Sequence, residues 1–238
     1  MADTSISLCM VVRNAAPHLE RLLPRVGTIV QEILICDQES TDDTVKVAQK
    51  YGARVMPTTC KGYADPDRQY CYNNASCDWI LAMDPDEDLD SFLLASIPEM
   101  AAEPNVDCYW FMFENRVNGV DISDVTGPDP HPRMWRKLLP DGQPNVQWPA
   151  EAHQFPLIRS PRVCYTEKGR FIHSRSLDEI EKSHAARFPQ ITGEREQQLE
   201  MEFMKIVRER CGNVLPGDFT ASKVKNPGTD SKPVGRQP

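Results

Sequence analysis

The stretch Asp78-Trp-Ile-Leu-Ala-Met-Asp-Pro-Asp-Glu87 decides the fold, because a short apolar run leads directly into a cluster of carboxylates. The run from Trp79 to Met83 has the length and composition of a strand buried in a parallel sheet. Five acidic residues follow within seven positions: Asp84, Asp86, Glu87, Asp88 and Asp90. Open α/β sheets bind ligands at the carboxyl ends of their strands, and clustered carboxylates repel one another unless a cation is present. The stretch therefore predicts a divalent metal that holds a phosphorylated substrate.

The residues around this stretch alternate between strand and helix signals. Apolar runs typical of strands cover residues 6–12, 32–36, 53–56 and 79–83. Helical patterns lie between and after them, around residues 19–23, 40–51, 66–76 and from 91 onward. We expect Ser40 to cap the second helix with Asp43 as its capping-box partner, and Ser91 to cap the fourth. This order predicts βαβ crossovers and an α/β fold with a mostly parallel sheet.

The pattern changes after residue 105. A strand rich in aromatic residues covers 106–114, and Arg116-Val-Asn-Gly119 is typical of a hairpin turn. Many prolines occupy 124–162, a short strand at 170–173 ends in a histidine, and two helical patterns cover 177–187 and 194–210. We therefore predict one domain over residues 1–211, with two halves that meet near residue 105. The polar segment 212–238 has almost no apolar content and is predicted to be a disordered tail.

Composition narrows the class of protein. The chain has 238 residues, 40% of them hydrophobic, with a net charge of -8 and a pI of about 5.2. The acidic balance disfavours a broad nucleic-acid surface. No apolar run approaches the roughly 18 residues that span a bilayer, and no secretory signal begins the chain. Eight cysteines without a CxxC pair disfavour zinc and favour reduced thiols. We expect a cytosolic or membrane-peripheral protein.

Four segments together resemble family 2 glycosyltransferases of the GT-A fold, especially the compact type related to lipopolysaccharide-core hexosyltransferases. The segment Ser7-Leu-Cys-Met-Val-Val-Arg-Asn14 is similar to the family's opening strand, which ends in Asn. The segment Ile33-Leu-Ile-Cys-Asp-Gln-Glu-Ser-Thr-Asp-Asp-Thr44 is similar to its nucleotide strand. Arg68 occupies the place of an Arg-Asn pair, and Asp84-Pro-Asp86 that of the metal-binding DxD motif. The resemblance covers residues 5–187.

The resemblance implies a nucleotide-sugar-binding half at 1–104 and an acceptor and catalytic half at 105–211. In the first half it implies that Asn14, Asp37, Arg68 and Asp84 bind the donor and that Asp86 binds Mn²⁺ or Mg²⁺. Simpler alternatives are a turn cap for Asp37 and a solvated helix-capping loop for the acidic cluster.

An EF-hand loop is excluded for the acidic cluster, since Leu89 and Ala95 replace its glycine and its terminal glutamate. We expect Asp88 and Asp90 to cap a helix or lie on the surface.

The second half carries weaker similarities. Pro132-Arg-Met-Trp-Arg136 resembles a family strand, and Trp148-Pro-Ala-Glu-Ala-His-Gln154 resembles a segment that ends in His-Glu in relatives. Because glutamine cannot accept the proton of an attacking hydroxyl, we predict Glu151 as the catalytic base, with His153 supporting or replacing it. His173 is expected to complete the metal sphere.

The same resemblance implies phosphate contacts from Arg175 and Lys182. The predicted activity is metal-dependent transfer of a sugar from a nucleoside-diphosphate donor, UDP being expected, to a hydroxyl acceptor with inversion. The acceptor is a glycan, a lipid-linked sugar, a protein or a modified nucleic acid. Two alternatives are a degenerate protein that binds sugar nucleotides without turnover, and a nucleotidyltransferase. The second is weakened because no glycine lies in Arg13-Asn-Ala-Ala-Pro17.

Overall fold

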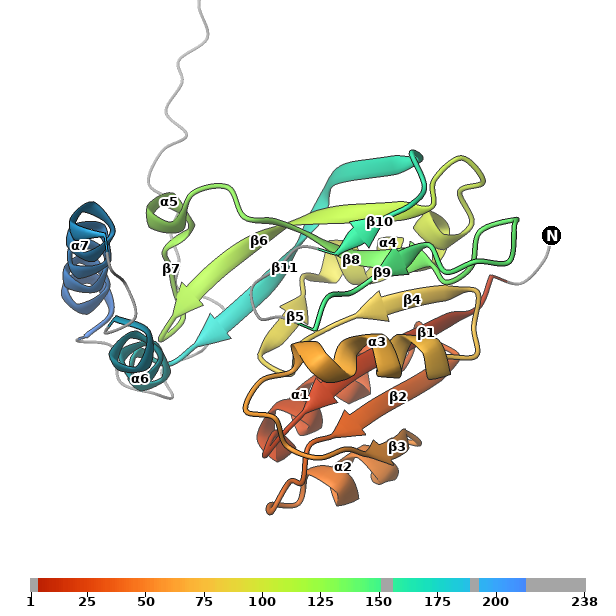
Figure 1. The fold of residues 1–238 in the computed structure, drawn as a ribbon, viewed down its shortest axis with the longest axis horizontal. Coiled ribbons are helices and arrows are strands. Elements are labelled where there is room, and N and C mark those ends of the chain that lie inside the picture. Colours follow the sequence, from red (N-terminus) through yellow and green to blue (C-terminus); the bar gives the residue numbers. More distant parts are fainter. Residues whose placement is uncertain (1–3, 151–155, 189–192, 213–238) are drawn as a thin grey trace, which may run out of the picture.

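One half of the molecule is a parallel sheet of four strands: β1 (Ile6–Val12), β2 (Glu32–Asp37), β3 (Arg54–Pro57) and β4 (Trp79–Ala82). Figure 1 shows it in the computed structural model, which describes residues 4–150, 156–188 and 193–212. The strands lie in the order β3-β2-β1-β4, so the chain passes from β1 outward to β3 and then returns to the other side of β1 with β4. Every residue of β1 and β4 is buried, which accounts for their unbroken apolar sequences.

Helices cover both faces of this sheet: α1 (Ala16–Val26), α2 (Thr44–Lys50), α3 (Asp65–Asn74) and α4 (Ser91–Ala101). Alternate residues of β1 point to opposite faces and so enter two separate cores. Leu8 and Met10 pack with apolar residues of α1, α2 and α4, whereas Cys9 and Val11 pack with Cys71 of α3. The predicted α/β class is therefore confirmed for the first half of the chain.

The second half extends the same sheet with mixed strand directions. Its elements are β6 (Cys108–Val117), β7 (Val120–Asp121), α5 (Ser123–Thr126), β8 (Pro130–Arg136) and β11 (Val163–Arg175), and β5 (Glu87–Leu89) from the first half also joins this part of the sheet. The full order is β3-β2-β1-β4-β8-β6-β11-β5, with β7 paired to β6 through the predicted turn at Asn118-Gly119. Both turn residues have positive φ, as a two-residue hairpin of this type requires. The short strands β9 (Val146–Gln147) and β10 (Leu157–Ile158) form a separate pair.

Two helices follow the sheet, α6 (Leu177–Arg187) and α7 (Glu194–Cys211). Figure 1 shows them at the left, beyond the carboxyl ends of β6 and β11. Their bounds agree with the predicted helical stretches, and residues 213–238 of the tail predicted for 212–238 lie outside the described residues. Among the described helices, none is long and apolar enough to cross a bilayer.

Two predicted helix caps are wrong. Helix α2 begins at Thr44, and the hydroxyl of Ser40 instead accepts a hydrogen bond from the backbone N–H of Asn14 at 2.8 Å. The backbone N–H of Thr44 donates to Asp42 at 3.0 Å. Helix α4 is capped by Asp90, whose carboxylate accepts from the Leu93 N–H at 2.7 Å. Asp90 therefore has the expected capping role, while Ser91 is the first helical residue.

The irregular centre of β11 depends on Gly169. Its φ is +81°, and a Cβ added there would lie 2.6 Å from the Leu93 Cβ and 2.7 Å from the Leu93 backbone nitrogen. We expect Gly169→Ala to lower the free energy of unfolding by about 2 kcal/mol, because strain at positive φ adds to a backbone clash. Urea unfolding followed by far-UV circular dichroism measures this change.

Gly142 provides the matched control for this substitution. Its φ is +75°, but a Cβ at this position meets nothing within 4 Å. Gly142→Ala therefore carries the backbone strain alone, at about 1 kcal/mol. An equal loss of unfolding free energy in Gly169→Ala and Gly142→Ala would show that the predicted clash between β11 and α4 does not lower stability.

Candidate active site

Three strand ends meet at one edge of the sheet. Val12 of β1 pairs in register with Asp37 of β2, and Cys9 pairs with Ala82 of β4. The polar residues that follow these strands, including Asn14 and Asp84, are therefore brought together as predicted for the carboxyl edge of a parallel sheet. A cavity of about 730 Å³ opens at this edge, and we refer to it as the main cavity. Its charged lining residues are Arg13, Asp65, Arg68, Asp84, Asp86, Glu87, Asp129, Arg133 and Glu179.

Two arginines hold the first aspartate of the DxD motif. Asp84 lies 2.7 Å from the Arg68 guanidinium and 3.3 Å from that of Arg133. Arg133 also forms an ion pair with Glu87, whose other carboxylate oxygen accepts from the Asp84 backbone N–H at 2.9 Å. Burial opposes ionisation of Asp84, but the neighbouring guanidinium groups of Arg68 and Arg133 lower its pKa. Burial raises the pKa of Glu87.

Asp86, the second aspartate of the motif, faces His173 on β11. The Asp86 Oδ2 and the His173 Nε2 are 3.0 Å apart, and the backbone of Asp86 accepts a hydrogen bond from the Ser174 N–H. Burial disfavours both charges, but the hydrogen bond between them lowers the pKa of Asp86 and raises that of His173. The structure thus brings together the two residues that were predicted to bind the metal.

The other ring nitrogen of His173 belongs to a chain of hydrogen bonds along the cavity wall. His173 Nδ1 lies 3.2 Å from the Asn115 Oδ1, and the Asn115 amide donates to Asp129 at 3.1 Å. Asp129 in turn pairs with His131 Nε2 at 2.7 Å. Because the Asn115 oxygen only accepts, it places a proton on His173 Nδ1. The Asp86 carboxylate likewise accepts from Nε2–H, so a cation beside Asp86 would displace this proton and bind to the Nε2 lone pair.

The Asp86 oxygen and the His173 nitrogen are suitable ligands for a divalent cation, but two protein ligands do not complete a metal site. Among residues 4–150, 156–188 and 193–212, no group of three or more His, Cys, Asp or Glu side chains is arranged to hold a metal. A carboxylate and an imidazole are ligands that Mn²⁺ accepts, and substrate phosphates and waters commonly fill its remaining positions. Asp86 and His173 therefore fit a metal that binds together with a phosphorylated ligand.

The other residues predicted to bind the nucleotide sugar, Asp37, Asn14 and Arg68, have different surroundings. Asp37 is 5% exposed; its Oδ2 accepts from the Ser40 N–H at 3.1 Å, while its Oδ1 is buried without a hydrogen-bond partner among the described residues. Asn14 lines the main cavity, but its side-chain oxygen accepts from the Thr41 N–H and so holds the loop before α2. Arg68 lies beneath Trp148, with its guanidinium carbon 5.2 Å from the ring centroid.

Four predicted residues lie away from this cluster or outside the described chain. Arg175 lines a neighbouring cavity and donates to the Glu179 carbonyl oxygen at 3.3 Å. Lys182 is exposed on α6 and is not among the lining residues of the main cavity. The two residues predicted for proton transfer, Glu151 and His153, fall outside the described residues.

The structure adds two residues for which no role was predicted, Arg133 and Trp148, and corrects the expectation for Asp88. Arg133 is the most buried arginine of the cluster, with 6% of its surface exposed, and its Nε is buried without a partner among the described residues. Trp148 is anchored to α3, since its backbone N–H donates to the Gln69 side chain at 2.7 Å and its indole N–H to Asp65 at 3.2 Å. Asp88, expected as a cap or surface residue, is instead buried in an ion pair with Arg25.

This sheet, with Asp84 and Asp86 at the carboxyl edge of β4, has the arrangement of a GT-A glycosyltransferase fold. The sequence model of glycosyl transferase family 2 matches residues 7–147, and the chain belongs to this family. The S. aureus TarS fragment 1–349, solved in complex with UDP-GlcNAc, superposes with a TM-score of 0.50 and 15% identity. That superposition covers 87% of this chain and 73% of TarS 1–349, and it supports the fold alone.

Curated relatives match over a shorter region. An uncharacterized glycosyltransferase of Rickettsia felis is 37% identical over 106 residues, which is 44% of this chain. A TPR repeat-containing protein of Synechococcus elongatus is 36% identical over 88 residues, or 37% of this chain. The matched regions cover only 36% and 22% of these two proteins.

Proposed function

We propose that this protein transfers a sugar from a nucleoside-diphosphate donor to a hydroxyl acceptor with the help of a divalent metal. The observation that supports this most strongly is the Asp86–His173 pair at the carboxyl edge of the sheet. It lies beside a cavity of about 730 Å³, which is large enough for a nucleotide sugar. The family of the chain and its GT-A fold agree with this activity.

The donor is proposed to be a UDP-sugar, with its base or ribose near Asp37. The buried Oδ1 of Asp37 has no hydrogen-bond partner among the described residues, and such a group is satisfied when a ligand donates to it. Asp84 is held as a carboxylate by two arginines and is suited to accept from a ribose hydroxyl. UDP-GlcNAc is the ligand in the TarS 1–349 complex, and we propose the same nucleotide for this chain.

Asp86 and His173 are proposed to hold Mn²⁺ or Mg²⁺. When bound, this ion offsets the negative charge that develops on the departing nucleoside diphosphate. The protein's part is to fix the two ligands before substrate arrives. The Ser174 N–H holds the backbone of Asp86, and Asn115 orients the ring of His173. Such support from outside the ligand pair is what keeps a metal site in its productive geometry.

Proton removal is assigned to the segment that begins after Trp148. We keep Glu151 as the proposed base, with His153 supporting or replacing it, and direct displacement with inversion as the expected stereochemistry. The described part of this segment supports the assignment, because the two hydrogen bonds from Trp148 to α3 place its start on the wall of the main cavity. The attacking hydroxyl of the acceptor needs a base within hydrogen-bond distance, and the proposed base lies in the segment that follows this wall.

Thermal unfolding with a panel of nucleotide sugars tests donor binding. We expect one UDP-sugar to raise the unfolding temperature by about 5 °C when Mn²⁺ is present, because a ligand near 100 times its Kd adds about 2.7 kcal/mol. EDTA should abolish the increase. An unchanged unfolding temperature with every nucleotide sugar, in the presence of Mn²⁺, would contradict the proposed function.

The degenerate binding protein is the second candidate, and turnover separates it from the enzyme. The observation that favours it is the sequence: Gln154 stands where relatives carry a glutamate. The enzyme should release UDP from the donor that stabilises it, and a coupled assay for UDP measures this. Tight donor binding without release on any acceptor would establish the binding protein instead.

A further inference from the structure

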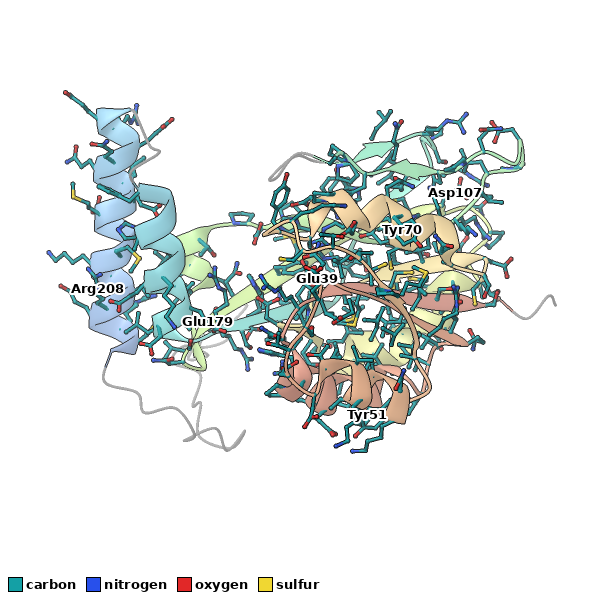
Figure 2. All side chains as sticks on the ribbon, turned by 60° about the horizontal axis from the view of Figure 1, so that its bottom comes forward. Glu39, Tyr51, Tyr70, Asp107, Glu179 and Arg208 are labelled. Carbon is teal, nitrogen blue, oxygen red and sulfur yellow. The ribbon has the colours of Figure 1, made fainter. Side chains whose placement is uncertain are left out.

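A second cavity adjoins the main cavity and has the opposite balance of charge. Its volume is about 470 Å³, and we call it the arginine cavity after Arg21, Arg116 and Arg175, which line it. Its other ionisable lining residues are His18 and Glu179, and both of them also line the main cavity. Figure 2 shows Glu179 near the start of α6, where the sheet meets the C-terminal helices. The two cavities are therefore neighbours that share a wall.

The charges of the two cavities suit different ligands. The main cavity is lined by six carboxylates and three arginines, whereas the arginine cavity is lined by three arginines and one carboxylate. That carboxylate is already engaged, because Glu179 accepts hydrogen bonds from the backbone and hydroxyl of Ser176 at 2.6 and 2.8 Å. The first arrangement suits a ligand that brings a cation with it, and the second suits an anion.

The arginines retain capacity for a ligand. Among the described residues, the Arg175 side chain donates a 3.3 Å hydrogen bond to the Glu179 carbonyl oxygen and forms no ion pair with a carboxylate. Arg116 pairs with Glu114 at 2.5 Å, and the nearest approach of Arg21 to Asp88 is 3.9 Å. A guanidinium has five N–H donors, so these contacts leave most of them available. Arginine forks are the side chains best matched to phosphate and carboxylate groups.

The position of the arginine cavity identifies which substrate it serves. Ser174 and Arg175 directly follow His173 on β11, and both line the arginine cavity, whereas His173 lines the main cavity. A ligand in the arginine cavity therefore lies next to the proposed metal pair but outside the cavity proposed for the nucleotide. The proposed metal pair, Asp86 and His173, already serves the phosphates of the nucleotide donor. We therefore take a ligand in the arginine cavity as the second substrate, the acceptor.

We propose that the acceptor carries a phosphate group and that Arg21, Arg116 and Arg175 bind it in the arginine cavity. The proposal rests on the proposed function, because it takes the main cavity as the donor site. It reassigns the phosphate contact expected of Arg175 from the donor to the acceptor. The acceptor hydroxyl then reaches the donor from the β11 side, with its phosphate anchored one residue beyond the metal pair.

Calorimetric titration of the full chain with glucose 6-phosphate and with glucose tests this, each in the presence and absence of UDP and Mn²⁺. We expect the phosphorylated sugar to bind at least about tenfold more tightly than glucose. The double variant Arg116→Gln/Arg175→Gln should lose about tenfold in affinity for glucose 6-phosphate, and its affinity for UDP with Mn²⁺ should change less than about twofold. Arg159→Gln is the control, since Arg159 pairs with Asp141 near the β9–β10 pair and lines neither cavity.

Equal binding of the two sugars, or full affinity in the double variant, would overturn the proposal. Failure of UDP to bind the wild-type chain would contradict the proposed function separately, because the titrations without UDP report on the arginine cavity alone. Sedimentation with phosphatidylglycerol vesicles, compared with phosphatidylcholine vesicles, is the third arm. Vesicle binding that requires the same two arginines, without binding of glucose 6-phosphate, would assign the cavity to a lipid surface and also overturn the proposal.

Discussion

Asp86→Ala is expected to lower the rate of sugar transfer on the order of a hundred- to a thousandfold and to remove the Mn²⁺-dependent increase in unfolding temperature with donor. The reason is that, among the described residues, Asp86 supplies the only carboxylate oxygen within hydrogen-bond distance of the His173 ring, at 3.0 Å. Without it, His173 alone would have to hold the cation. Steady-state kinetics of UDP release, measured against Mn²⁺ concentration, gives the change.

Stability separates a lost ligand from a damaged fold. The Asp86 side chain is 32% exposed, so Asp86→Ala should change the free energy of unfolding without metal by about 1 kcal/mol or less. Asp88→Asn is the matched control two residues further on. Its carboxylate pairs with Arg25 and lies outside the main cavity, so this variant should lose stability and keep the metal-dependent increase. Metal-dependent transfer by Asp86→Ala at the wild-type rate would refute the assignment of Asp86.

Arg133→Met is expected to lower the free energy of unfolding by about 4 kcal/mol, because it leaves a buried carboxylate without its cation. Arg133 is 6% exposed, and its partner Glu87 is 2% exposed. Burial already raises the pKa of Glu87, so loss of the guanidinium would force this group to take up a proton. Urea unfolding at neutral pH measures the loss.

A second substitution tests whether the unpaired charge causes this loss. In Glu87→Gln/Arg133→Met the buried residue is neutral, and we expect the double variant to be more stable than Arg133→Met alone. Arg159→Met removes an arginine from an exposed ion pair and should have a far smaller effect. A loss below about 1 kcal/mol for Arg133→Met would mean that Arg68 alone neutralises the cluster.

The parts of the fold that could be predicted from the sequence are those encoded by local patterns. Buried strands such as β1 and β4 have continuous apolar runs, and the hairpin at Asn118-Gly119 has the residues that positive φ requires. Asp84 and Asp86 could be predicted as candidate site residues because they closely follow the apolar strand β4. The predicted cap at Ser40 was wrong because its hydroxyl accepts a hydrogen bond from the backbone of Asn14, 26 residues away, and this tertiary contact outweighs the local preference. The predicted cap at Ser91 was wrong by one position, because Asp90 accepts the capping hydrogen bond.

The parts of the site that could not be predicted depend on pairing between distant strands. Arg133 reaches Asp84 because β8 lies antiparallel beside β4, and nothing in the segment 130–136 specifies that neighbour. Asn115 reaches His173 because β6 and β11 are parallel and pair these two residues directly. The ion pair of Asp88 with Arg25 likewise joins elements 63 residues apart. Such contacts follow from sheet order, which local patterns leave open.

The pairing of β5 with β11 has a consequence for how this protein can be recombined. By sequence, β5 lies in the half proposed to bind the nucleotide, yet it is hydrogen-bonded to the strand that carries His173, with Glu87 opposite His173 in register. The chain divides near residue 105, but the sheet does not. A chimera that exchanged the second half for that of another glycosyltransferase would also replace β11, the strand with which β5 of the acidic stretch pairs. We therefore expect the proposed donor and acceptor sites to be exchangeable only together, because this three-residue strand joins the two halves of the sheet.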